Sequence, residues 1–234
     1  MISLSAALRS ALLPGAMALA LAACDGASSS GATGSEAAAS SPEAGAGASD
    51  GVGALAEMAV GDEDAAVTVI EYASLTCPHC ATFHETIYPE IKEKYVDTGK
   101  VRFIFREFPT APAELSIAAS MLARCAADKG GQDAYFLVLG SLFKTQRAWI
   151  TGDSPRAELI KVANQTGMDE AAFDACMKRE ELLDLINGNV NDARNRYDVR
   201  STPSFIVNGD LRHFSTVEDF SGAIDEALEK AGAE

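Results

Sequence analysis

Two cysteines separated by two residues, in the segment Cys77-Pro78-His79-Cys80, are the residues of this chain best arranged for chemistry. They follow a run of β-branched and apolar residues, 67–73, and precede a stretch with helical character. One turn of a helix brings two sulfur atoms at this spacing within bonding distance. The motif and its place between a strand and a helix therefore predict a pair that alternates between dithiol and disulfide.

The expected position of Cys77 at the start of a helix indicates how the two sulfurs divide the work. Unpaired backbone N–H groups and the positive end of the helix dipole meet in the first helical turn. Pro78 suits the first helical position, where its missing N–H costs nothing, and His79 adds positive charge or a donor beside the sulfur. These effects lower a cysteine pKa and make its thiolate a good leaving group. We expect Cys77 to be the attacking sulfur and Cys80 the resolving one.

The Cys-Pro-His-Cys segment resembles the active site of the DsbA family of thiol:disulfide oxidoreductases. Glu71, six residues before Cys77, matches the buried acid of that family. Residues 199–209, which include Thr202-Pro203, are similar to the family's cis-proline loop and the strand after it. The resemblance covers residues 52–234. It implies an α/β, thioredoxin-like fold with an inserted α-helical subdomain at about residues 112–196.

The resemblance also implies roles for residues outside the motif. A cis Pro203 would hold the backbone of Thr202 beside Cys77, where a substrate strand can pair with it; the alternative is a trans proline that only starts a strand. The best-known oxidases of the family have valine at the position of Thr202, whereas disulfide isomerases and several other DsbA-like proteins have threonine. Glu71 is a candidate proton acceptor for Cys80 through water. Its alternative role is an ion pair with a cation such as Arg102 or Arg106.

Residues 1–23 predict a signal peptide, with Arg9 followed by an apolar stretch too short to span a bilayer. The sequence Leu21-Ala22-Ala23-Cys24 resembles a bacterial lipobox, which implies cleavage before Cys24 and lipid attachment to it. Asp25 resembles the signal that keeps lipoproteins at the inner membrane. The alternative is an ordinary signal peptide with an incidental Cys24. Residues 24–51 are almost wholly Ala, Gly and Ser, and so predict a flexible tether rather than a core.

Five cysteines leave one unpaired if the others form two pairs. With Cys24 assigned to lipid and Cys77 to Cys80, the remaining two are Cys125 and Cys176, which lie in the helical insertion. One branch of the DsbA family carries a second, structural disulfide there. Closing this loop of about 50 residues would stabilise the fold by about 4 kcal/mol. The alternative is two buried, unpaired thiols.

Hydrophobic periodicity and turn signals predict the remaining elements. We expect strands at residues 55–60, 67–73 and 101–108, and a hairpin of strands 205–207 and 211–214. We expect helices at residues 78–97 with a kink at Pro89, and at 113–128, 132–143, 155–166, 169–178, 180–196 and 216–230.

The sequence as a whole predicts a protein-disulfide oxidoreductase that introduces disulfides into exported proteins, with no cofactor. A formal net charge of −15 argues against nucleic acid and against adhesion to anionic lipid. We expect a monomer at the periplasmic side of the inner membrane, anchored through Cys24, or otherwise a soluble periplasmic protein. Its substrates would be reduced or misoxidised exported proteins. Its redox partner would resemble the membrane oxidases DsbB or VKOR.

Two alternatives use the same residues. A disulfide isomerase or reductase would keep Cys77 reduced and receive electrons from a DsbD-like partner. A metallochaperone would bind zinc or copper(I) through Cys77, Cys80 and His84, although a closed zinc site needs a fourth ligand. Outside that reading, we assign no role to His84.

Overall fold

The computed structural model describes residues 53–233. The expected signal peptide (1–23), the lipidation of Cys24 and the tether (24–51) lie outside the described residues and stay predictions. Among residues 53–233, no helix combines the length and the apolar character needed to cross a membrane.

A five-stranded mixed sheet forms the centre of the fold, with strand order β1-β3-β2-β4-β5. Its strands are β1 (Met58–Val60), β2 (Val67–Ala73), β3 (Val101–Glu107), β4 (Ser204–Val207) and β5 (Asp210–Arg212). Strands β2 and β3 are parallel, and the other neighbours are antiparallel. Strand β2 at the centre is buried on both faces, as its apolar run predicts. This topology confirms the expected thioredoxin-like sheet.

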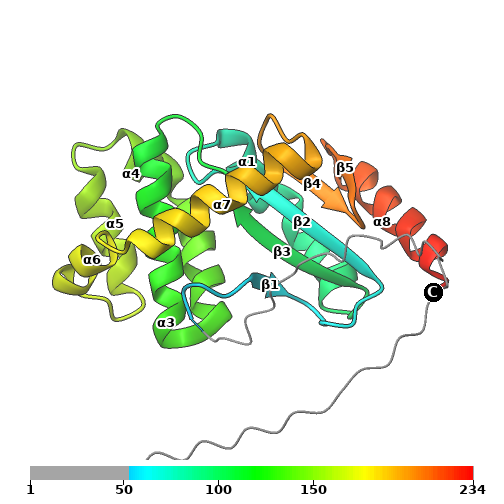
Figure 1. Cartoon of the computed structure of the whole chain (residues 1–234), viewed down its shortest axis with the longest axis horizontal. Helices are drawn as coiled ribbons and strands as arrows, with labels where there is room; N and C mark the ends of the chain where they lie inside the picture. The colour runs from blue at the N-terminus through cyan, green and yellow to red at the C-terminus, as the bar shows by residue number, and fades with distance from the viewer. Residues whose placement is uncertain (1–52, 234) are drawn as a thin grey trace, which may run out of the picture. The chain divides into compact units, whose positions relative to one another are not determined.

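Five helices stand between β3 and β4 in the chain and form the helical insertion, which lies beside the sheet in Figure 1. They are α3 (Ala113–Lys144), α4 (Gln146–Thr151), α5 (Pro155–Asn164), α6 (Glu170–Cys176) and α7 (Glu180–Tyr197). The other helical elements are α1 (Pro78–Thr86), α2 (Tyr88–Ile91), the π-helical turn η1 (Lys92–Val96) and α8 (Val217–Ala231). The expected inserted helical subdomain is therefore present.

Several boundaries differ from the sequence-based expectation for local reasons. The helix expected at 78–97 is divided at Ile87, because Pro89 removes one N–H and crowds the carbonyl one turn earlier. The expected break between helices 113–128 and 132–143 is confirmed, since Gly130 and Gly131 have non-helical backbone angles inside α3. Helix α4 was not predicted, and the first strand begins at Met58 instead of residue 55.

A buried ion pair joins the sheet to the helical insertion. Arg124 of α3 donates to both carboxylate oxygens of Glu107 at the end of β3, at 2.7 and 2.9 Å. Tyr135 and Asn189 also donate to this carboxylate, at 2.9 and 2.6 Å. The guanidinium also binds two backbone carbonyls of the segment before β1, at 3.0 and 2.8 Å. Glu107 therefore contacts both long helices of the insertion, α3 and α7.

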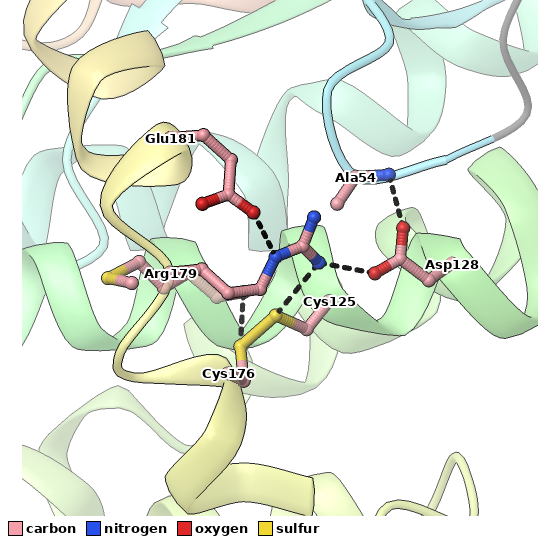
Figure 2. Close-up of a disulfide and its surroundings, with 7 residues drawn as sticks. Ala54, Cys125, Asp128, Cys176, Arg179 and Glu181 are labelled. Carbon is pink, nitrogen blue, oxygen red and sulfur yellow. Dashed lines mark hydrogen bonds and ion pairs between the residues drawn. A yellow bond between two sulfur atoms is a disulfide. The ribbon is translucent and has the colours of Figure 1, made fainter. Parts of the chain in front are cut away.

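A disulfide between Cys125 of α3 and Cys176 of α6 closes a sequence separation of 51 residues. Figure 2 shows Arg179 over this bond, with its guanidinium directed to the Cys125 sulfur at 3.7 Å. The same guanidinium pairs with Asp128, and its Nε donates to Glu181 at 2.7 Å. The bond and these pairs tie the start of α7 to α3.

Replacing both partners, Cys125→Ala/Cys176→Ala, should lower the free energy of unfolding by about 4 kcal/mol, because the unfolded chain regains the entropy of a long open loop. Denaturant unfolding without reductant measures this loss. The matched control is Cys77→Ala/Cys80→Ala, which removes a pair with only two intervening residues and should lose far less. Equal stability losses in the two double variants would contradict a tethering role for the second disulfide.

Arg124→Met should lower the free energy of unfolding by about 3–5 kcal/mol, because it leaves the carboxylate of Glu107 buried without its cation. Arg156→Met is the matched control, since Arg156 also contacts two acidic residues, Glu170 and Asp174, but on the exposed surface. Solvent screens such pairs, so its loss should be much smaller. Denaturant unfolding of both variants provides the comparison. Similar losses of unfolding free energy in the two variants would show that burial does not make the Arg124–Glu107 pair more important than a surface pair.

Candidate active site

The two motif cysteines lie at the junction of β2 and α1, where the sequence places them. Cys77 is the N-cap of α1 with an extended backbone, and Pro78 opens the first turn. Both cysteines are free thiols in this structure. Cys77 is 7% exposed and Cys80 is fully buried, whereas Pro78 and His79 between them are exposed. Only Cys77 therefore offers a sulfur that a partner protein can approach.

The surroundings of Cys77 lower its pKa from 9.0 to about 5. The largest cause is a hydrogen bond from the Cys80 thiol, and bonds from the Thr202 side chain and the N–H groups of Cys80 and His79 act in the same direction. Burial opposes them, because it disfavours the charged form. At neutral pH Cys77 is therefore a thiolate, the nucleophilic form of cysteine.

Cys80 has the opposite electrostatic character. Burial raises the pKa of its thiol far above the ordinary value, and the hydrogen bond to Cys77 and the charge of Glu71 raise it further. Cys80 is therefore protonated at neutral pH. The motif holds one ionised sulfur and one neutral sulfur, as attacking and resolving roles require.

The loop before β4 brings Thr202 and Pro203 beside the motif, although they lie 125 residues away in the chain. The Thr202-Pro203 peptide bond is cis. In its thiol form Cys77 donates to the carbonyl oxygen of Thr202 at 3.3 Å. Strand β4, which starts at Ser204, pairs with β2 and so fixes this loop next to the start of α1. The expectation that Thr202 lies beside Cys77 agrees with this geometry.

Glu71 is fully buried in β2, and the alternative pairing with Arg102 or Arg106 is wrong. In the β2–β3 register Glu71 stands opposite Phe105, so the two arginines project from the other face of the sheet. There both contact Glu57. The partner of Glu71 is His84 of α1, whose Nε2 lies 2.8 Å from Oε2.

Two further residues, His84 and Gln146, belong to this site and were not predicted as part of a redox centre. His84 had no role, although it lies four residues after Cys80 and hence on the same side of α1. Gln146 was missed because α4 was not predicted. Its Nε2 donates to the carbonyls of Leu75 and Cys77, both at 2.9 Å. These two bonds attach the turn that contains Cys77 to the helical insertion.

The metal-binding alternative gains no support from the side-chain positions. The Nε2 of His84 is directed to Glu71. Within residues 53–233, no three His, Cys, Asp or Glu side chains are grouped in a way that could hold a metal ion.

Curated relatives share most of the described chain. The family model described as Thioredoxin matches residues 54–226. A Rickettsia bellii protein, named provisionally as a protein-disulfide oxidoreductase, is 34% identical over 175 residues, which cover 75% of this chain and 66% of the relative. A Rickettsia felis protein of the same name is 33% identical over 174 residues, covering 74% and 61%. The chain thus spans less than two thirds of the length of these two relatives.

A comparison with a solved structure supports the same family. The crystal structure of α-DsbA1 from Wolbachia pipientis matches with a TM-score of 0.67 and 31% identity, covering 75% of this chain and 92% of that chain. The family model, the sheet order and the helices inserted between β3 and β4 are in agreement. This chain belongs to the thioredoxin family, as a DsbA-like member with a helical insertion.

Proposed function

We propose that this protein is a thiol:disulfide oxidoreductase that introduces disulfides into exported proteins through Cys77 and Cys80. The observation that carries the proposal is the unequal state of the two sulfurs. A pKa of about 5 at Cys77 stabilises the reduced form at neutral pH, and this makes the disulfide form an oxidant. The name of the Rickettsia bellii relative supports the same class of reaction.

The exchange starts from the disulfide form of the pair. A substrate thiolate attacks the sulfur of Cys77, the Cys77–Cys80 bond breaks, and its electron pair goes to Cys80. A second substrate thiolate then attacks the substrate sulfur of the mixed disulfide and releases Cys77 as a thiolate. The substrate has lost two electrons, and the protein holds them as a dithiol, the form present in this structure.

The buried position of Cys80 creates a need for a proton. When the Cys77–Cys80 bond breaks, Cys80 leaves as a thiolate in a site that strongly favours the thiol. We assign Glu71 as the group that supplies this proton through water and takes it back on reoxidation. The backbone beside the cis Thr202-Pro203 bond is the docking edge for an extended substrate segment.

Location and partners follow from the same proposal. The signal peptide and a lipid on Cys24 would hold the protein at the periplasmic side of the inner membrane, with residues 24–51 as tether. A DsbB-like or VKOR-like membrane oxidase would return the dithiol to the disulfide. Without the lipid, the protein would act as a soluble periplasmic protein.

A second candidate function is a disulfide isomerase or reductase fed by a DsbD-like donor. Thr202 supports it through the family resemblance, because disulfide isomerases have threonine at the position that lies beside the Cys77 sulfur. In that case reduced Cys77 would be the resting nucleophile toward misoxidised proteins.

Ultraviolet titration of the thiolate in the reduced, full-length protein should give a midpoint near pH 5 for Cys77. Cys80→Ala should raise this midpoint, because it removes the thiol that donates the strongest hydrogen bond to the thiolate. Cys77→Ala should abolish the transition. An unchanged midpoint in Cys80→Ala would refute the hydrogen bond as the main cause.

The same pKa predicts how the stability of the reduced protein depends on pH. Between about pH 5 and pH 9 the folded chain binds fewer protons at Cys77 than the unfolded chain does, so its stability rises with pH. The contribution disappears as pH falls through about 5. The free energy of unfolding of reduced wild type and of reduced Cys77→Ala, measured across this pH range, isolates the contribution of Cys77. Curves of stability against pH that run parallel would exclude that contribution.

The equilibrium reduction potential of the Cys77–Cys80 pair decides between the two candidate functions. Measured in glutathione buffers without metal, a value near about −120 mV is expected for a disulfide donor. A value near about −270 mV, in the range of reducing thioredoxins, would reject that role in favour of a reductase or isomerase. Cys125→Ala/Cys176→Ala serves as the control, because it removes the second disulfide from the titration.

A further inference from the structure

Glu71 keeps one carboxylate oxygen without a partner in the interior. Its Oε2 lies 2.8 Å from His84, whereas its Oε1 is buried and has no hydrogen-bond partner among the protein groups. A buried polar atom without a partner costs free energy, so its retention calls for a function. The charge of Glu71 acts on the buried Cys80 thiol. The carboxylate therefore lies between a sulfur that must change its protonation state and a histidine.

His84 connects this interior carboxylate to a cavity of about 580 Å³. Its side chain is 7% exposed, and its ring stacks on Phe143 with centroids 4.3 Å apart. Tyr88 packs on the ring at 5.0 Å. Residues of β1, α1, α2, η1 and α3 line the cavity, among them His84, Tyr88, Lys92, Gly140, Phe143 and Lys144. Gly140 and Lys144 are exposed, so water reaches the cavity and the edge of the histidine.

We propose that His84 relays protons between Glu71 and water in this cavity, so that Cys80 exchanges its proton by a route separate from the substrate surface at Cys77 and Thr202. The relay rests on the proposed thiol–disulfide exchange. His84 touches neither sulfur in this arrangement. It acts through Glu71 and is a positioning and relay residue.

The proton balance follows the exchange cycle. When substrate attacks Cys77, Cys80 leaves as a thiolate and takes a proton from Glu71 through water. That proton reaches Glu71 from His84 at Nε2, and His84 regains one at Nδ1 from water in the cavity, so Glu71 is a carboxylate before and after the exchange. On reoxidation Cys80 attacks the mixed disulfide at Cys77, and its proton leaves along the same groups in reverse. One proton enters and one leaves in each cycle, while the electrons pass only between sulfurs.

The other titratable groups around the pair do not offer this route. Burial raises the pKa of Tyr88 in α2 and of Tyr135 in α3, so both phenols stay protonated at neutral pH. Lys92 of η1 pairs with Asp97. Glu85 and Lys144 line the cavity but are exposed. His84 is the group that contacts both Glu71 and the cavity.

Chemical rescue tests the relay. The oxidised full-length protein is mixed with dithiothreitol, and formation of the dithiol is followed by acid quench and alkylation across a range of pH. His84→Ala should slow the reaction roughly 100-fold, because the group that supplies protons to Glu71 is lost. Free imidazole, which fits the cavity, should restore most of the rate in this variant and leave wild type unaffected. A purely structural role of His84 would give no imidazole dependence.

A second variant tests the route with His84 in place. A side chain added at Gly140 meets no atom within 4 Å at its Cβ, so Gly140→Phe can enter the cavity and exclude water from the histidine. It should slow the exchange as His84→Ala does, without rescue by imidazole. Gly222→Phe is the matched control, because Gly222 is an exposed α8 glycine with equally open surroundings. It should react at the wild-type rate.

The outcomes separate the relay from the proposed function. If wild type fails to exchange with dithiothreitol, the oxidoreductase function fails. If wild type exchanges and His84→Ala matches its rate, or is slow without any response to imidazole, the relay is wrong. If His84→Ala does not fold by circular dichroism, the comparison of Gly140→Phe with Gly222→Phe decides, and equal rates overturn the relay.

Discussion

The unequal burial of two sulfur atoms one helical turn apart is the constraint on which the rest of this structure depends. Cys77 is ionised because donors converge on it at the start of α1, and Cys80 is neutral because it has no exposure. The thiol of Cys80 is itself the main donor to Cys77, so each state supports the other. Moving either sulfur by a fraction of a turn would remove the asymmetry and the chemistry that needs it.

The helical insertion supplies the environment that the motif alone cannot create. Helix α3 packs on the sheet face that carries Glu71, since its Tyr135 and Phe143 contact Phe105, the register partner of Glu71. Helix α4 reaches the carbonyl of Cys77 through Gln146. Helix α3 is held against the sheet by Arg124, which donates to both carboxylate oxygens of Glu107. The buried carboxylate keeps these bonds only while α3 is docked. Figure 1 shows the insertion alongside the sheet end that carries α1.

The features that the sequence predicted are those written locally in the chain. Strand β2 has the expected bounds, 67–73, because its apolar run is short and bounded by turn signals. The redox motif, the break at Gly130 and Gly131 and the hairpin after Pro203 likewise depend on neighbours in sequence.

The features that it did not predict depend on the sheet register and on packing between distant segments. The partner of Glu71 follows from the parity of β2 against β3, which sets Arg102 and Arg106 on the opposite face. The sequence of one strand does not show how it is aligned with its neighbour, and therefore which residues share a face of the sheet. Gln146 lies on a helix of six residues, too short to give a periodic signal. The site is therefore more than its motif, because the groups that hold and serve the sulfurs come from α3, α4 and the loop before β4.

The burial that distinguishes the two sulfurs also imposes the deepest requirement on the fold. A thiolate at Cys80 cannot persist in the interior, yet breaking the disulfide must create one. Electrons enter the pair through Cys77, the sulfur that a substrate can approach, but a proton cannot follow the same path through a docked substrate. A carboxylate with one oxygen that no protein group contacts, beside the buried sulfur and bonded to a histidine at a solvent-accessible cavity, meets this requirement with groups the fold already holds. That oxygen costs free energy in the dithiol form, so the fold keeps it for proton transfer and not for stability.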